Sequence, residues 1–233
     1  MSACLLVRER TAELHARVEA RAGFDGGVLT ERSAFALLAG LADLSDVVLQ
    51  AVDGPAAGGL PLAALDWPAR RARLLGYPAD LALLGQHLER SLPAPEPSSP
   101  ADPAQLLGWL YVAEGASLGS VLIQRALVRQ PWAAEVPLRS FQGHGAETGR
   151  RWRDFRAAAD GWAAGDPDRA GGMVAGASAA FTRVERRMAR ALAAAGPWQD
   201  GLSGAPGILG DRGVAAQQRA VRGAPTPAEE PHP

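Results

Sequence analysis

Residues 108–120 read Gly-Trp-Leu-Tyr-Val-Ala-Glu-Gly-Ala-Ser-Leu-Gly-Ser, and they lie within the longest and most apolar helix that the sequence predicts, 103–130. Each of the three glycines inside this helix costs about 1 kcal/mol relative to alanine, so some close contact should offset them. Their separations of seven and four residues place Gly108, Gly115 and Gly119 on nearly the same stripe of the helix. Such a stripe accepts either a flat ligand or a neighbouring helix against bare backbone, and both interpretations stay open at this point.

The rest of the chain also favours helices, because Ala, Leu and Arg dominate it. No segment alternates convincingly between apolar and polar residues, and no Asn-Gly hairpin turn occurs. Asp66, Asp102 and Asp166 each precede a Pro by one or two residues, which is typical of a helix start. We therefore expect an all-α fold with helices near residues 4–21, 31–52, 67–76, 79–92, 103–130, 146–164 and 168–195.

The predicted helices form one domain over residues 1–197. The Pro-rich segment 93–100 is expected to be an exposed linker between two helices of that domain. From residue 198 the periodicity dissolves into Gly, Pro, Ala and Gln, which predicts a mobile tail over 198–233.

Composition excludes several classes of protein. In 233 residues, 24 basic and 25 acidic side chains nearly cancel, which argues against binding to nucleic acid or to a membrane surface. Cys4 is the single cysteine, so an internal disulfide framework and a Cys-clustered zinc or iron–sulfur site are excluded. Every basic residue is Arg, and without Lys neither Schiff-base chemistry nor a Walker-type phosphate loop can form.

The N-terminal residues do not resemble a signal peptide, and no apolar run approaches the roughly 18–20 residues of a spanning helix. We therefore expect a protein of the cytoplasm that does not enter the membrane.

A second informative segment lies near the N-terminus. Arg8, Thr11, His15 and Glu19 recur at helical spacing, so one face presents a cation, a hydroxyl, an imidazole and a carboxylate in a row. Imidazole is the commonest side-chain metal ligand, and a carboxylate one turn away can accept its second N–H. The alternative is an ordinary surface helix with a half-buried histidine.

Together these motifs resemble those of bacterial heme oxygenases. The family resemblance rests on Arg-x-x-Thr-x-x-x-His-x-x-x-Glu over residues 8–19 and on the Leu-Tyr-Val-Ala-Glu-Gly-Ala-Ser-Leu-Gly run over 110–119. Two weaker matches follow, within residues 141–155 and at 177–181, in the expected order and spacing. The resemblance is greatest to the biliverdin-forming enzymes that serve bacteriophytochromes.

This resemblance implies a helical bundle that holds heme between a proximal and a distal helix. It makes His15 the proximal iron ligand and makes the distal glycines, Gly115 and Gly119, catalytic through their backbone. The resemblance and the residue pattern together give these further candidates: Arg8, Thr11, Glu19, Tyr111, Trp152, Arg153 and Phe181 for heme binding, and Ser117 for ordering distal water. Family members commonly carry Ser at position 116 and often Gly at position 120, where this chain has Ala116 and Ser120.

The implied reaction converts heme, O2 and electrons to biliverdin, carbon monoxide and ferrous iron, with heme as both cofactor and substrate. A thiolate ligand or a distal His–Arg pair promotes O–O cleavage, as in cytochromes P450 and peroxidases, whereas a neutral imidazole and glycine backbone do not. Residues 143–148 lack the third glycine of a dinucleotide fingerprint, so a separate reductase or ferredoxin should supply the electrons. A bacteriophytochrome is an implied recipient of the biliverdin.

Other interpretations remain at the level of sequence. The chain could be a non-catalytic heme-binding or heme-sensing protein on the same fold, a thiaminase-like enzyme, or a plain helix–helix interaction module. Of the other histidines, His87 is interpreted as structural, and His144 in its Gly-rich loop is a rival iron ligand.

Overall fold

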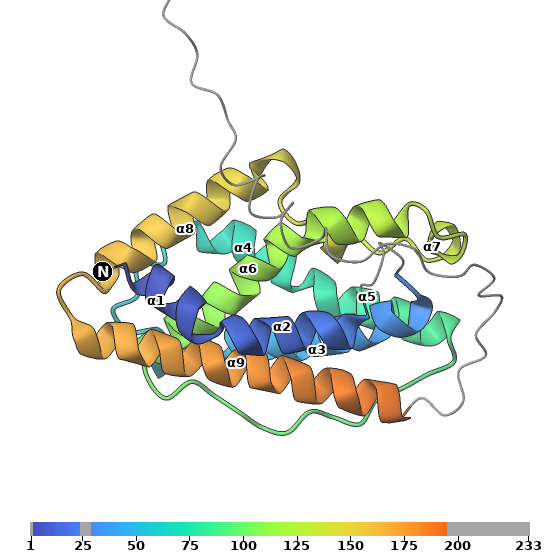
Figure 1. The fold of residues 1–233 in the computed structure, drawn as a ribbon, viewed down its shortest axis with the longest axis horizontal. Coiled ribbons are helices and arrows are strands. Elements are labelled where there is room, and N and C mark those ends of the chain that lie inside the picture. Colours follow the sequence, from blue (N-terminus) through green and yellow to red (C-terminus); the bar gives the residue numbers. More distant parts are fainter. Residues whose placement is uncertain (1, 24–28, 195–233) are drawn as a thin grey trace, which may run out of the picture. The chain divides into compact units, whose positions relative to one another are not determined.

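Two long helices, α6 (Pro103–Leu127) and α9 (Pro167–Ala194), pack against each other (Figure 1). The computed structural model describes residues 2–23 and 29–194, and these residues contain helices and turns but no strand. The other helices are α1 (Ala3–Arg10), α2 (Ala12–Ala22), α3 (Glu31–Val52), α4 (Trp67–Leu74), α5 (Gly76–His87), α7 (Trp132–Glu135) and α8 (Thr148–Trp162). The all-α prediction is confirmed.

Glycines allow α6 and α9 to approach each other at backbone distance. A Cβ atom built on Gly108 would lie 2.2 Å from the carbonyl oxygen of Met173. On the facing helix, a Cβ on Gly176 would lie 2.1 Å from the carbonyl oxygen of Gln105. Gly108 therefore belongs to a helix–helix contact. The glycine stripe predicted for α6 thus has two parts: Gly108, which packs on α9, and Gly115 with Gly119, which do not.

The predicted helix 4–21 is broken at Thr11 into α1 and α2. The Thr11 hydroxyl donates a 2.8 Å hydrogen bond to the carbonyl oxygen of Val7, which closes the last turn of α1. α1 packs on α8, where the backbone N–H of buried Cys4 donates to Asp160 at 2.8 Å. α1 and α2 both pack on α9, and the break lets α1 also contact α8 while α2 also contacts α3.

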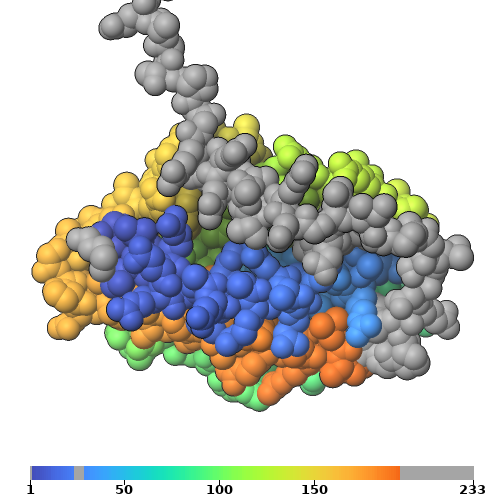
Figure 2. Space-filling view, in the orientation of Figure 1, coloured from blue at the N-terminus to red at the C-terminus, as the bar shows by residue number. Residues whose placement is uncertain are grey.

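α2 packs on α9 through a pair of arginines. Arg17 and Arg21 both reach Glu185 on α9, at 3.1 and 3.2 Å. Figure 2 shows the side chains of α2 (blue) and α9 (orange) forming one continuous surface. The helix that carries His15 is therefore fixed against the longest helix of the protein.

Most of the observed helix starts agree with the starts predicted from the sequence. The Asp102 side chain accepts from Gln105 N at 2.8 Å, and Asp166 accepts from Arg169 N at 3.0 Å. α3 has the predicted bounds, with Thr30 as its N-cap. Asp66 is the exception, since it adopts a positive φ of 49° and pairs with Arg151 instead of capping α4.

The linker 93–100 runs along α9 (Figure 1) and is bound to it at Glu96. The Glu96 carbonyl oxygen accepts a 2.6 Å hydrogen bond from Arg183, and its carboxylate pairs with Arg190. Arg183 also donates to buried Asp43 on α3 at 2.7 Å. The exposed segment expected from sequence is thus tied at its centre to α9, and Arg183 connects this contact to α3.

Two helices, α3 and α6, are long and apolar enough to span a membrane by length and composition alone. This corrects the expectation that no apolar segment approaches that length. Most of their apolar windows, 83% and 61%, are buried inside the protein. Packing in the protein core accounts for their composition.

The predicted domain boundary at 197/198 and the tail over 198–233 lie outside the described residues. The described residues all belong to one compact unit.

Candidate active site

His15 lies on α2 with half of its side chain exposed, at 51%. Its Nδ1 atom is 3.5 Å from the Glu19 carboxylate one helical turn later. The edge of its ring faces Phe181 on α9, with ring centroids 5.5 Å apart. Glu19 and Phe181 therefore restrict the imidazole from two sides, and Nε2 is the ring nitrogen left for a ligand.

The second part of the glycine stripe is open. A Cβ atom built on Gly119 would meet nothing within 4 Å, and one on Gly115 would meet only the Trp152 ring at 3.9 Å. The neighbouring side chains of Leu118 and Leu122 are exposed apolar groups. α6 therefore presents bare backbone beside apolar side chains, a surface suited to a flat apolar ligand.

Aromatic side chains border this part of α6. Tyr111 contacts Trp152 of α8 with centroids 5.2 Å apart, and Trp152 stacks on Phe155 at 5.8 Å. Burial raises the pKa of Tyr111 to about 12, so its phenol stays protonated across the physiological range. The positive charge of Arg8 on α1 opposes this rise in pKa, so Arg8 lies near the same phenol. The structure thus groups three predicted residues, Arg8, Tyr111 and Trp152.

The two predicted propionate contacts, Arg8 and Arg153, are exposed residues of α1 and α8. Neither forms a salt bridge with a carboxylate in the part of the chain that the structure describes. Both guanidinium groups can therefore bind an anionic group of a ligand without first breaking an ion pair.

Two predicted residues do not reach this surface with their side chains. Thr11 is 2% exposed and bonded to its own helix turn. Ser117 is 1% exposed and donates a 2.6 Å hydrogen bond to the carbonyl oxygen of Glu114. At 100° per residue, Ser117 lies about 200° from both Gly115 and Gly119, on the opposite side of α6.

The sequence did not predict a buried ionic cluster that lies on the side of α6 away from the glycine surface. Glu114 pairs with Arg70 and, at 3.1 Å, with Arg73, both on α4. His144 Nε2 lies 3.7 Å from the Glu114 carboxylate, and all four side chains are at least nine-tenths buried. Glu114 is the single charged residue from Gly108 through Ile123, and that isolation was the signal that it needs a buried cationic partner.

The charge of Glu114 is strongly favoured. Burial alone would raise the pKa of its carboxyl group, but the contact with His144 and the charges of Arg73 and Arg70 outweigh burial and lower the pKa to about 2. Glu114 is therefore an anion at neutral pH, held among cationic and polar groups.

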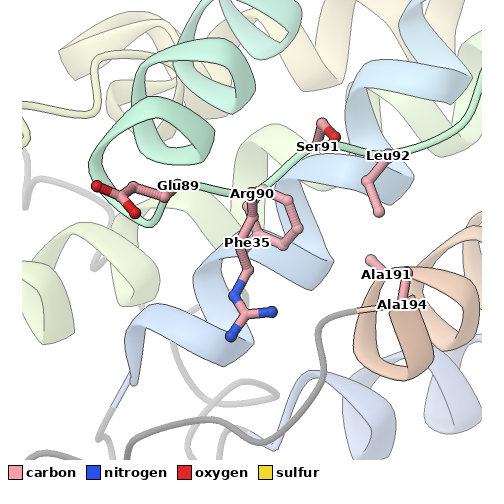
Figure 3. Close-up of a pocket in the computed structure, with 7 residues that line it drawn as sticks. All are labelled: Phe35, Glu89, Arg90, Ser91, Leu92, Ala191 and Ala194. Atoms are coloured by element: carbon pink, nitrogen blue, oxygen red, sulfur yellow. The ribbon is translucent and has the colours of Figure 1, made fainter.

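A separate pocket lies between α3, the turn after α5 and the end of α9 (Figure 3). Its lining residues are Phe35, Glu89, Arg90, Ser91, Leu92, Ala191 and Ala194. None of the predicted site residues lines it. Over residues 2–23 and 29–194, no group of three or more His, Cys, Asp or Glu side chains could hold a metal ion.

Comparison with known proteins agrees with this geometry. Residues 82–190 match the family model described as heme oxygenase. The solved heme oxygenase of Leptospira interrogans superposes with a TM-score of 0.58 at 18% identity, over 81% of this chain and 98% of that one. The chain has the heme oxygenase fold. The NO- and CO-bound heme oxygenase of Neisseria meningitidis gives a TM-score of 0.53 at 20% identity, over 88% of this chain and 98% of that one.

The heme oxygenase match includes α6, α8 and most of α9, and so includes the glycine surface, Trp152 and Phe181. It begins after α2, so the assignment of His15 depends on its motif and its surroundings. No curated protein sequence matches the chain.

Proposed function

We propose that this protein is a heme oxygenase that cleaves heme to biliverdin, carbon monoxide and ferrous iron with O2 and external electrons. One observation supports it above the others: a heme oxygenase fold that carries both an oriented, half-exposed His15 and an open glycine backbone at Gly119. Heme itself, when bound, supplies the iron that activates O2 and the porphyrin ring that is oxidised.

His15 is the proposed proximal ligand, through Nε2. Glu19, beside Nδ1, favours the tautomer with its proton on Nδ1 and leaves Nε2 unprotonated for the iron. Phe181 supports the ring from the side of α9. A neutral imidazole donates less electron density than a thiolate, which suits oxidation of the porphyrin rather than O–O cleavage.

The glycine surface is the proposed distal wall. Bare backbone at Gly115 and Gly119 lets a flat ring approach α6 closely and leaves no side-chain acid or base above it. Tyr111 and Trp152 close one side and exclude water from it. When heme is bound, the shape of this wall would direct oxidation to one edge of the ring.

Arg8 and Arg153 are proposed to bind the heme propionates and so set the rotation of the ring. Thr11 contributes through the helix break that ends α1 before His15. The Ser117 side chain lies on the opposite side of α6 from the glycine surface. Backbone carbonyl groups of that surface are therefore the proposed groups that order distal water.

The partners follow from the reaction. Electrons are proposed to come from a separate reductase or ferredoxin in the cytoplasm. Biliverdin is the chromophore of bacteriophytochromes, and the resemblance to their biliverdin-forming enzymes supports such a protein as the recipient.

Hemin titration of the full chain, followed by reduction under O2, tests the proposal. We expect a saturable Soret band that His15→Ala weakens, that added imidazole restores, and that His144→Ala leaves intact. On reduction the Soret band should disappear and biliverdin absorbance should rise. A stable Soret band without biliverdin would identify a non-catalytic heme protein, and no Soret band would identify a helix-packing module.

A further inference from the structure

The loop that carries His144 is held firmly against the back of α6. The Asp80 carboxylate on α5 accepts two hydrogen bonds from Ser140, from its N–H at 2.7 Å and its hydroxyl at 2.6 Å. At the other end of the loop, the Thr148 hydroxyl accepts from His144 N at 3.0 Å and donates to the Gly145 carbonyl oxygen at 2.8 Å. His144 is therefore fixed from both sides.

Gly143 brings this loop into contact with α6. Its φ of 59° is one that side chains rarely adopt, and a Cβ there would lie 3.2 Å from the Ser117 carbonyl oxygen. The next side chain along the loop is His144, which enters the cluster of Arg70, Arg73 and Glu114. The loop thus delivers one imidazole to the side of α6 that faces away from the glycine surface.

The same stretch of α6 receives several further hydrogen bonds on its carbonyl groups. Arg73 donates to the Ala113 carbonyl oxygen at 2.8 Å, and Ser117 donates to that of Glu114 at 2.6 Å. Ser120 donates to the carbonyl oxygen of Ala116 at 3.1 Å. Side-chain hydrogen bonds to helix carbonyls alter the local path of a helix, so these contacts act on the turn that contains Gly115.

Two buried polar atoms in this arrangement, His144 Nε2 and Arg73 Nε, lack a hydrogen-bond partner within the described residues. His144 Nε2 is buried, lies 3.7 Å from Glu114 Oε2, and has no hydrogen bond within the described residues. Arg70 and Arg73 face Glu114 from α4, and the Tyr77 hydroxyl of α5 accepts from Arg73 at 2.9 Å. At 3.7 Å the imidazole still lies within contact distance of the Glu114 carboxylate, so it meets α6 through that side chain.

We infer that His144 is a positioning residue of the site: through Glu114 it holds in place the turn of α6 that carries Gly115 and Gly119, the proposed distal wall. This inference rests on the proposed function. It gives His144 a role distinct from that of an iron ligand, because its side chain is enclosed behind α6.

The test compares two polar variants that differ in reach. His144→Gln can extend an amide to Glu114, whereas the shorter His144→Asn cannot. His87→Asn is the matched control, since His87 makes a similar contact with Glu31, at 3.1 Å, on the surface. In the protein without hemin, we expect amide hydrogen exchange over residues 113–119 to rise about three- to tenfold in His144→Asn only.

The second measurement uses the ferrous hemin-loaded protein with carbon monoxide as the probe. Wild type, His144→Gln and His87→Asn should give one narrow C–O stretching band, and His144→Asn should give a shifted or broadened band. Unchanged exchange and an unchanged band in His144→Asn, with normal hemin binding, would overturn the inference and leave the proposed function intact. Failure of the wild type to bind hemin would refute the proposed function, while hydrogen exchange would still report whether His144 holds α6.

Discussion

Glycine has two different uses within one helix of this protein. Gly108 lets two backbones meet, whereas Gly119 leaves a surface that nothing among the described residues covers within 4 Å of a Cβ position. The sequence predicts the stripe from spacing alone, but spacing does not show where along the stripe the facing helix ends. That boundary depends on the crossing of α6 and α9, which is a property of the assembled bundle.

Gly119→Leu should leave the protein without hemin no less stable, because leucine improves helix propensity by a few tenths to about 1 kcal/mol and meets no neighbour. It should prevent turnover of heme by placing a branched side chain on the proposed distal wall. Urea unfolding and biliverdin formation measure the two effects. Gly108→Ala is the matched variant, and we expect it to cost about 1–3 kcal/mol of stability because its Cβ meets backbone. Equal destabilisation by both variants would show that Gly119 is also a packing contact.

Glu114 gives a pH-dependent contribution to stability. Its folded pKa of about 2 lies below the ordinary value of 4.5, so the stabilisation is complete above pH 4.5 and is lost as the pH falls toward 2. Glu114→Gln leaves two buried arginines without their carboxylate and should cost about 3–5 kcal/mol at pH 7. The difference in unfolding free energy between wild type and Glu114→Gln should shrink steadily between pH 5 and pH 3. Glu147→Gln, which removes a surface carboxylate, should change little at either pH, and a pH-independent difference for Glu114→Gln would contradict this account.

At the scale of elements, most helices are predictable because the residues that cap them are adjacent to them in the sequence. Thr30 and Asp102 cap helices at the expected residues, and α3 has the expected bounds. The break at Thr11 is not predictable in the same way, since Thr11 fits the helical spacing of its neighbours. Both helices pack on α9, and the break serves the additional contacts of α1 with α8 and of α2 with α3. The partners of Glu114 are equally hidden, because arginines are numerous in the chain and only the fold selects Arg70 and Arg73.

The contact between α9, α3 and the linker should depend on one of its arginines far more than on the other. Arg183 is buried with Asp43, so Arg183→Leu leaves a buried carboxylate unpaired and should cost about 3–5 kcal/mol. Arg190 pairs with Glu96 at the surface, and Arg190→Leu should change stability by less than about 0.5 kcal/mol. Thermal unfolding of the two variants checks this order, and equal losses would show that the surface pair of Arg190 with Glu96 stabilises the protein as much as the buried pair of Arg183 with Asp43.

At the scale of the whole molecule, residues from Gly201 onward lack helical periodicity, and the sequence predicts that they add little to the bundle. A chain that ends at residue 200 should keep its unfolding midpoint within a few degrees and its affinity for hemin within about twofold. Differential scanning calorimetry and hemin titration of the shortened chain provide the measurement. A fall of several degrees would mean that these residues pack on the helices.

Burial of Cys4 makes the chain's one thiol a reporter of how α1 opens. Burial and the nearby charge of Asp160 raise the pKa of Cys4 to about 12, so almost none of this thiol is ionised at neutral pH. Thiol reagents react with the thiolate, so buried Cys4 should react slowly. Its rate of modification by a thiol reagent therefore measures how often α1 leaves α8 and α9. Since α1 carries Arg8 and leads directly into α2, the helix of His15, hemin binding should slow this modification. The modification rate of a single sulfur atom then gives the frequency with which the candidate site opens.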